Sequence, residues 1–73
     1  MTYDKKRIGK RIASLRVDIG LSQEELAADV GVSNSAITRY ETGQSVPSLE
    51  TAYKLAVRLG CTLDRLSCRD LKE

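Results

Sequence analysis

The chain has 73 residues, enough for one small domain, and its 12 Lys and Arg against 10 Asp and Glu give a net charge of +2 at pH 7. A chain of this length hides about 60% of its unfolded surface and folds around one core, which leaves no room for a separate catalytic domain. Because Phe and Trp are absent, the core must consist of Leu, Ile, Val, Ala and Tyr, which favours packed short helices and predicts an all-α fold.

Residues 3–19 carry the pattern of an amphipathic helix. Its apolar positions recur every three or four residues, the spacing of a helix face that packs against a core. Thr2 and Asp4 are both suitable N-caps, and Gly20 is expected to end the helix. The stripe that we assign to the core consists of Ile8, Ile12, Leu15 and Ile19.

The same helix holds much of the basic charge. Six Lys and Arg residues precede residue 17, against Asp4 as the single acid. A basic segment of this kind suits a DNA phosphate backbone or an anionic membrane, and it is also common on an ordinary solvated helix face. We single out Lys10 and Arg11 as candidate phosphate contacts.

Residues 22–43 predict two short helices joined by a tight turn. Ser22 begins an S-x-x-E capping box, and Gly31 is suited to leave the helix in the left-handed conformation. Ser33 caps the second helix, and Gly43 marks its end. Two capped helices separated by about three residues and a glycine have the layout of a helix-turn-helix.

The second of these helices has an unusual exposed face. At 100° per residue, Ile37, Tyr40 and Glu41 lie on the side towards the core. The opposite face has hydroxyls, an amide and a guanidinium, which can hydrogen-bond base edges and phosphates in a DNA major groove. An ordinary solvated face is the alternative, although such faces usually include Glu and Lys. The outer residues are Asn34, Ser35, Thr38, Arg39 and Thr42.

The remaining residues predict a loop and two further helices. Residues 44–47 form the loop, because Pro47 lacks a backbone N–H and disfavours helix at the residue before it. A fourth helix follows Ser48 and ends at Gly60, a short fifth helix comes next, and the charged tail at 67–73 is expected to fray. One face of the fourth helix is assigned to Leu49, Ala52, Tyr53, Ala56 and Leu59.

A set of residues with a fixed spacing runs through nearly the whole chain: Gly20, Leu21, Ser22, Gln23, Leu26, Ala27, Gly31, Val32, Ser33, Ile37, Glu41, Gly43, Pro47, Ser48, Leu49, Leu55, Ala56, Leu59, Leu63, Asp64 and Leu66. At these positions the sequence resembles the phage-repressor and Cro type of helix-turn-helix domain. The resemblance implies a compact five-helix, lambda-repressor-like DNA-binding domain whose third helix enters the major groove while the second lies across the backbone.

The resemblance also implies which residues contact DNA. The base-reading positions of the family fall on Asn34, Ser35 and Arg39, and Ser33 and Thr38 are additional candidates. A guanidinium can bind guanine O6 and N7 together, so Arg39 is the sharpest candidate. The best-known phage repressors have paired glutamines at the positions of residues 34 and 35, so their operator preference does not transfer. The candidate contacts to the DNA phosphate backbone are Gln23, Thr42, Gln44, Ser45 and Lys10.

Glu41 predicts a buried ion pair. Its carboxylate begins near the core, where a charge is costly unless it is paired and hydrogen-bonded. Arg16 lies on the flank of the first helix's apolar stripe, and its long stem can cover apolar surface while the guanidinium reaches the carboxylate. The family has the same pairing, so we expect an Arg16–Glu41 salt bridge; two separately solvated charges are the alternative.

Cys61 and Cys68 are the only cysteines, and the chain has no histidine. A structural zinc site needs four ligands, usually Cys or His, so one chain cannot supply such a site. We expect two reduced thiols, with Cys61 the less reactive, and no metal or cofactor. A disulfide between them is the alternative in an oxidising compartment.

These observations favour a sequence-specific DNA-binding transcriptional regulator, and the resemblance favours a repressor. No nucleophile stands beside a base and no Gly-rich phosphate loop is present, so we expect no enzymatic activity and no small-molecule ligand. No apolar run approaches the ~20 residues that span a bilayer, and charges fill the N-terminal region where a signal peptide would be apolar, so we expect a cytoplasmic protein. The alternative is a protein-interaction module, antitoxin-like or adaptor, that uses its last helix.

The expected partner is double-stranded DNA, bound by a homodimer on a palindromic site. A two-fold dimer would place two recognition helices roughly 34 Å apart, one turn of DNA. The apolar residues available for dimerisation near the C-terminus are Leu63, Leu66 and Leu71, and closing the monomer's own core is their alternative role.

Overall fold

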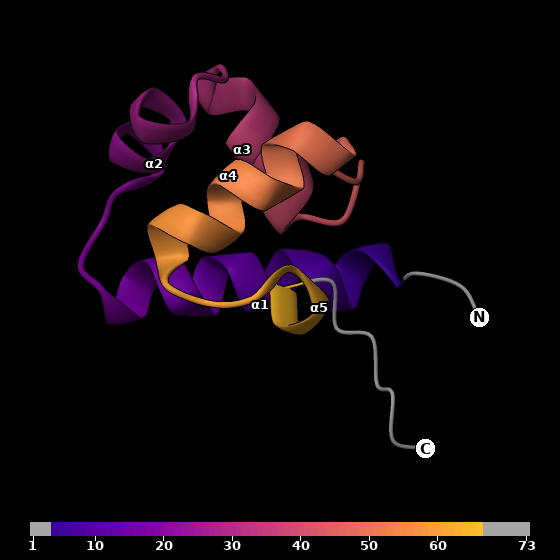
Figure 1. The fold of residues 1–73 in the computed structure, drawn as a ribbon. Helices are drawn as coiled ribbons and strands as arrows, with labels where there is room; N and C mark the ends of the chain where they lie inside the picture. The colour runs from indigo at the N-terminus through magenta and orange to yellow at the C-terminus, as the bar shows by residue number, and fades with distance from the viewer. Residues whose placement is uncertain (1–3, 67–73) are drawn as a thin grey trace.

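The computed structural model describes residues 4–66, and within that range the backbone forms five α-helices and no strand (Figure 1). This architecture confirms the all-α, five-helix fold expected from the sequence. The expected fraying of residues 67–73 lies outside the described residues. The helices are α1 (Lys5–Asp18), α2 (Gln23–Val30), α3 (Asn34–Glu41), α4 (Leu49–Leu59) and α5 (Leu63–Leu66).

Side-chain caps define where the first four helices begin. The carboxylate of Asp4 accepts hydrogen bonds from two backbone N–H groups of the first turn of α1, so Asp4 is the N-cap. Ser22 and Glu25 form the reciprocal capping box at the start of α2. Ser33 and Ser48 cap α3 and α4 in the same way, each accepting from a backbone N–H three residues on. Each cap satisfies donors that a helix start otherwise leaves unpaired.

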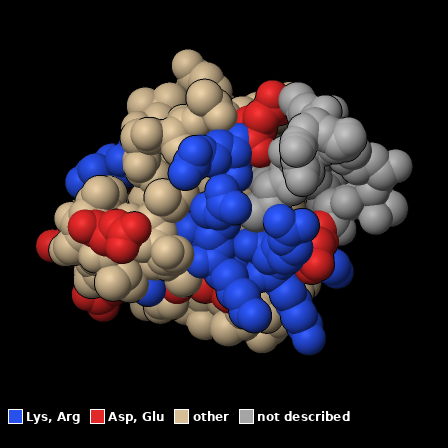
Figure 2. Space-filling view, turned by 90° about the horizontal axis from the view of Figure 1, so that it is seen from below, with Lys and Arg blue, Asp and Glu red and all other residues tan. Residues whose placement is uncertain are grey.

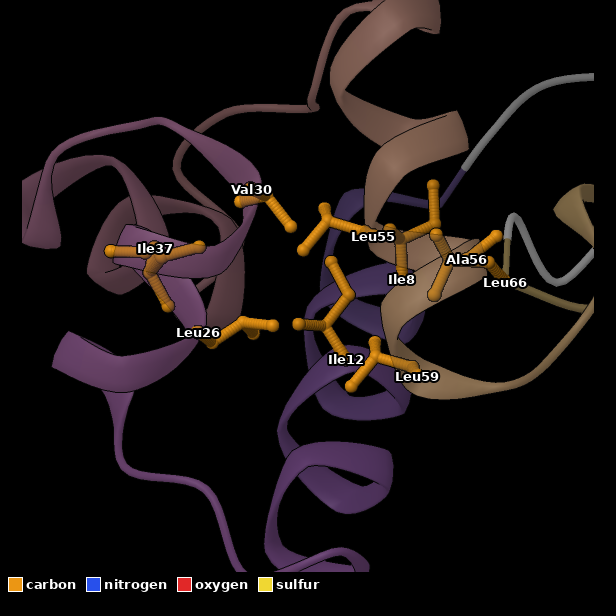
Figure 3. Close-up of a cluster of buried hydrophobic side chains, with 10 residues drawn as sticks. Ile8, Ile12, Leu26, Val30, Ile37, Leu55, Ala56, Leu59 and Leu66 are labelled. Atoms are coloured by element: carbon orange, nitrogen blue, oxygen red, sulfur yellow. The ribbon is translucent and has the colours of Figure 1, made fainter.

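All five helices contribute side chains to one core. Figure 3 shows these side chains converging from α1, α2, α3, α4 and α5. Burying such aliphatic groups is the main favourable term in folding. The buried cluster consists of Ile8, Ile12, Leu26, Ala27, Val30, Ile37, Leu55, Ala56, Leu59 and Leu66.

The buried face of α4 differs from the expected one. Leu49 and Tyr53 were assigned to the same face as Ala56, yet their side chains are 75% and 61% exposed. Ala56 and Leu59 are buried as expected, and Leu55 joins them in the core. The real face is therefore rotated by about 60° around the helix axis. Both faces are apolar in sequence, so the packing of α4 against α1, α2 and α5 selects between them.

The apolar stripe of α1 is also shorter than expected. Ile8 and Ile12 are buried, Leu15 is packed at the edge of the core, and Ile19 is exposed. The helix ends at Asp18, so Ile19 is its C-cap and no longer continues the helical face. Among residues 4–66, tyrosine contributes less to the core than expected, because Tyr40 packs against the core only from its edge and Tyr53 is exposed.

Helices α1 and α3 meet at a glycine that sequence analysis did not single out. Gly9 is buried within α1, where a Cβ would overlap the backbone oxygen of Tyr40 and lie 2.8 Å from that of Glu41. The absence of a side chain at Gly9 therefore lets the last turn of α3 rest directly on the backbone of α1. This contact fixes where α3 lies relative to the rest of the molecule.

Candidate nucleic-acid interface

The turn between α2 and α3 is set by backbone hydrogen bonds and one glycine. Gly31 follows α2 with φ 76°, in the left-handed region, and its N–H donates to Ala27 O. The N–H of Val32 donates to the same oxygen at 3.0 Å. Ser33 then starts α3, and its Oγ accepts from the N–H of Ala36 at 3.0 Å. This is the helix-turn-helix geometry that the caps predict.

Three of the expected base-reading side chains are exposed on α3 and available to a ligand. Asn34 and Ser35 lie in the first turn of α3, and Arg39 lies one turn further along. Among residues 4–66 these three side chains have no hydrogen-bond or ion-pair partner. Together they present an amide, a hydroxyl and a guanidinium, which are the groups that read base edges.

The hydroxyl groups of the other α3 candidates are already engaged. Thr38 Oγ1 lies 3.1 Å from Gln23 Oε1 and 3.2 Å from Asn34 O, and its single proton serves these acceptors. Thr42 Oγ1 donates to Thr38 O at 2.9 Å. Phosphate oxygens only accept hydrogen bonds, so Thr42 would have to break this bond to contact the DNA backbone. Ser33 uses its oxygen as a cap and keeps its proton free.

The loop after α3 offers side chains, but not backbone N–H groups, to a phosphate. The N–H groups of Gln44 and Ser45 both point to Arg39 O, at 2.9 and 3.4 Å, and so close the end of α3. These two backbone amides are therefore engaged within the protein and are not available to a phosphate. The side chains of Gln44 and Ser45 remain available. Lys10 is exposed on α1, whereas the half-buried Arg11 donates to the carbonyl oxygen of Arg65 at 3.0 Å.

A bidentate ion pair joins α3 to α1. Arg16 donates through Nε to one Glu41 oxygen at 2.7 Å and through Nη2 to the other at 3.0 Å. A third donor, Nη1, reaches Leu21 O at 2.9 Å. The two side chains are only 15% and 7% exposed, respectively. The hydrogen bond and charge of Glu41 raise the pKa of Arg16 against the opposing effect of burial, so the guanidinium stays charged.

Gln23 connects the same network to α2. Its amide nitrogen donates to Glu41 at 2.9 Å, and its amide oxygen accepts from Thr38 at 3.1 Å. Both partners lie on α3, so one side chain ties the start of α2 to two successive turns of α3. Of the two amide protons of Gln23, one remains for an external acceptor. The exposed face of α3 is thus held by polar contacts from both α1 and α2.

Basic side chains gather on the face formed by α1. Figure 2 shows Lys and Arg in a band across the middle of this face, with acidic groups lying mainly around it. Within α1 itself, no acidic residue occurs between the N-cap Asp4 and the last residue, Asp18. A surface of this kind favours the approach of a polyanion.

Comparison with known proteins identifies the family. A helix-turn-helix family model matches residues 12–66, so the chain belongs to this family. It is 32% identical over 63 residues to the Cryptic phage CTXphi transcriptional repressor RstR of Vibrio cholerae, which covers 86% of this chain and 56% of that protein. For the first three curated relatives, the chain spans 15%, 56% and 61% of their lengths.

Solved structures agree with this assignment. The restriction-modification controller protein C.AhdI from Aeromonas hydrophila is 38% identical, with TM-score 0.81 over 86% of this chain and 96% of that chain. The P22 c2 repressor, solved with a synthetic operator, is 36% identical, with TM-score 0.79 over 81% of this chain and 89% of that chain. The chain is thus a phage-repressor type of helix-turn-helix domain, as its sequence motifs indicate.

The residues expected at a dimer contact are not equivalent. Leu66 is 1% exposed and closes the monomer's core, so it is not available to a partner. Leu63 is half-buried, and Leu71 lies outside the described residues. Because it is buried, Leu66 is also unavailable to the alternative function, an interaction module that uses the last helix. Among residues 4–66, no helix has the length and apolarity required to cross a membrane.

Proposed function

We propose that this protein is a sequence-specific DNA-binding transcriptional regulator that reads the major groove with α3. One observation carries the proposal: Asn34, Ser35 and Arg39 are exposed and unengaged on a helix that is fixed by the Arg16–Glu41 pair. A base-reading group must be both free to bind and held in position, because a displaced donor loses its alignment with the base edge.

The residues have separate roles. Arg39 is suited to a bidentate contact with a guanine, and Asn34 to one with an adenine. The second amide proton of Gln23 donates to a phosphate while the rest of the amide holds α3. Phosphate contacts place the domain on the duplex, and base contacts select the sequence. Further phosphate contacts come from Gln44 and Ser45 side chains, and from Lys10.

Relatives support repression as the regulatory outcome. RstR is a transcriptional repressor, and the P22 c2 repressor was solved with an operator. Repression requires only that the protein occupy its site. The protein acts as a cytoplasmic homodimer on a palindromic operator, with recognition helices roughly 34 Å apart. Leu63 is the remaining apolar candidate for the dimer contact.

The test begins with selection of bound sequences from random duplex DNA. We expect a defined motif made of two inverted half-sites. Arg39→Ala should retain the fold and lose roughly 1–3 kcal/mol of preference for the selected duplex over a scrambled one. Lys54→Ala, which removes an exposed cation on α4, is the control and should keep this preference. Enrichment of no motif would reject the function, and an unchanged preference in Arg39→Ala would reject the role of Arg39.

A further inference from the structure

The start of α1 lies beside the segment that follows the recognition helix. Gly43, with φ 80°, is so close to α1 that a Cβ there would lie 2.8 Å from Lys6 Cγ and 3.2 Å from Lys6 Cα. Lys5 lies one helical turn before Gly9 on the same side of α1, the side on which the end of α3 rests. Lys6 is therefore next to the loop that carries Gln44 and Ser45, and Lys5 precedes it in the first turn of α1.

Neither lysine uses its positive charge in a contact within the described part of the protein. Both side chains are exposed, and neither has an ion pair or side-chain hydrogen bond among residues 4–66. The nearest acid in sequence, Asp4, uses one carboxylate oxygen to accept from the backbone N–H groups of Lys6 and Arg7. Lys54 differs, because it is paired with Glu50 at 3.4 Å. The charges of Lys5 and Lys6 are free for an external anion.

We propose that Lys5 and Lys6 bind phosphates of the DNA backbone just outside the major groove that α3 reads. This inference rests on the proposed function, and it extends the contact surface from the loop at Gly43–Ser45 onto α1. Lys and Arg side chains gather on the α1 side of the molecule (Figure 2), and this positive charge attracts the phosphates of a flanking duplex. A lysine is suited to this contact because its ammonium group follows a phosphate without requiring fixed geometry.

A structural role makes a different prediction. Lys6 lies near the C-terminal end of α3, where the helix carbonyls are partly negative and attract a cation. In that case, removing the charge lowers the melting temperature and leaves the salt dependence of DNA binding as it was. Phosphate binding instead changes the salt dependence and leaves the melting temperature nearly unchanged. Thermal unfolding and a salt titration on the same variants therefore distinguish the two roles.

The experiment compares Lys5→Gln, Lys6→Gln and their double variant with Lys54→Gln, the matched control. Affinity for the selected duplex is measured against salt concentration, and each lost phosphate contact should reduce the slope of log K against log salt by about 0.9. The double variant should lose about twice that slope. Lengthening the duplex by one turn should raise the affinity of the wild-type protein but not that of the double variant. Its preference for selected over scrambled DNA should remain, because phosphates carry no sequence information.

Three results overturn the proposal. The first is a slope in the double variant equal to that of Lys54→Gln. The second is a fall in melting temperature with no change in slope. The third is lysine-dependent binding to phosphatidylserine vesicles with an unchanged DNA slope, which would assign the lysines to a membrane surface. Failure of the wild-type protein to prefer any selected sequence is a separate result, and it rejects the proposed function.

Discussion

The carboxylate of Glu41 receives hydrogen bonds from two other helices, through Arg16 on α1 and Gln23 on α2. It is 7% exposed, and burying a carboxylate is unfavourable unless its oxygens are satisfied by such donors. Removing one partner leaves the other charge buried and unpaired, which strongly destabilises the folded state. The pair therefore couples the position of α3 to the stability of the whole domain.

Glu41→Gln should reduce the free energy of unfolding by about 3–5 kcal/mol, as is usual for one member of a buried pair. A double-mutant cycle with Arg16→Gln is required, because Arg16 also donates to Leu21 O. We expect a clear coupling energy from urea unfolding, and weaker DNA binding by both single variants. The exposed Arg58–Asp29 pair is the control, since such pairs contribute at most ~1 kcal/mol. A coupling energy for Arg16 and Glu41 no larger than that of the control would contradict this account.

Cys61 is a half-buried free thiol at the edge of the core, just after α4. Burial raises the pKa of this thiol, and the positive charges of Arg65 and Arg11 oppose that rise without cancelling it. A raised pKa means that the native fold favours the neutral thiol over the thiolate. The contribution of Cys61 to stability is thus complete below the pKa of the unfolded chain and is lost as the pH rises through the folded pKa.

In a Cys68→Ser background, the pH midpoint for alkylation of Cys61 should be higher in the folded protein than in urea. Arg65→Gln should move the folded midpoint higher still, because it removes a charge that stabilises the thiolate. With both cysteines present, Cys61 should react more slowly than Cys68. Cys61→Val should fold normally and still bind DNA. A folded midpoint at or below the unfolded one would show that burial does not control this thiol.

The packing of α3 on α1 depends on the absence of a side chain at Gly9. In most helices, replacing Gly by Ala is stabilising, by about 1 kcal/mol. At Gly9 the new Cβ would overlap the backbone oxygen of Tyr40, and a carbonyl at the end of a helix has little room to move. Steric overlap of backbone with a methyl group therefore outweighs the gain in helix propensity.

Gly9→Ala should lower the stability of the domain by about 1–3 kcal/mol, the usual cost of overpacking. The last turn of α3 should be displaced with it, so DNA affinity should fall as well. Ser14→Ala, on an exposed position of the same helix, is the matched control and should be neutral or slightly stabilising. Thermal unfolding and DNA titration of both variants measure these effects. A Gly9→Ala protein more stable than the wild type would contradict the close approach of α1 and α3.

Considered as a whole, the molecule has one core to which all five helices contribute, and its surface chemistry is divided between α3 and α1. The free polar groups of α3 suit base recognition, while the basic band of α1 suits the phosphate backbone. Both lie on helices held together by the Arg16–Glu41 pair and the Gly9 contact. The groups proposed to read bases and those proposed to attract phosphates are therefore carried by helices that share one core.

The amino-acid sequence alone was sufficient to predict the five helices, because their caps and ends are local features. Ser22, Ser33 and Ser48 pair with backbone groups only three residues away, and Gly31 and Gly60 end their helices by adopting positive φ. The Arg16–Glu41 pair was also predictable, because an acid on the core side of a helix needs a cation, Arg16 lies beside the apolar stripe of α1, and the resemblance to the family implies the same pairing. The roles of Asn34, Ser35 and Arg39 remain predictions.

Other features depend on contacts between segments distant in sequence. The rotation of the buried face of α4, which exposes Leu49 and Tyr53, depends on how α4 packs against its neighbours, because two overlapping apolar faces were available. Gly9 has no local signal, since its close approach involves a helix more than 30 positions away. The sequence allowed Leu66 to be either a dimer contact or a core residue, and its burial in the structure shows that it belongs to the core. Local hydrogen bonding is encoded in neighbouring residues, whereas steric fit between helices exists only once they are packed.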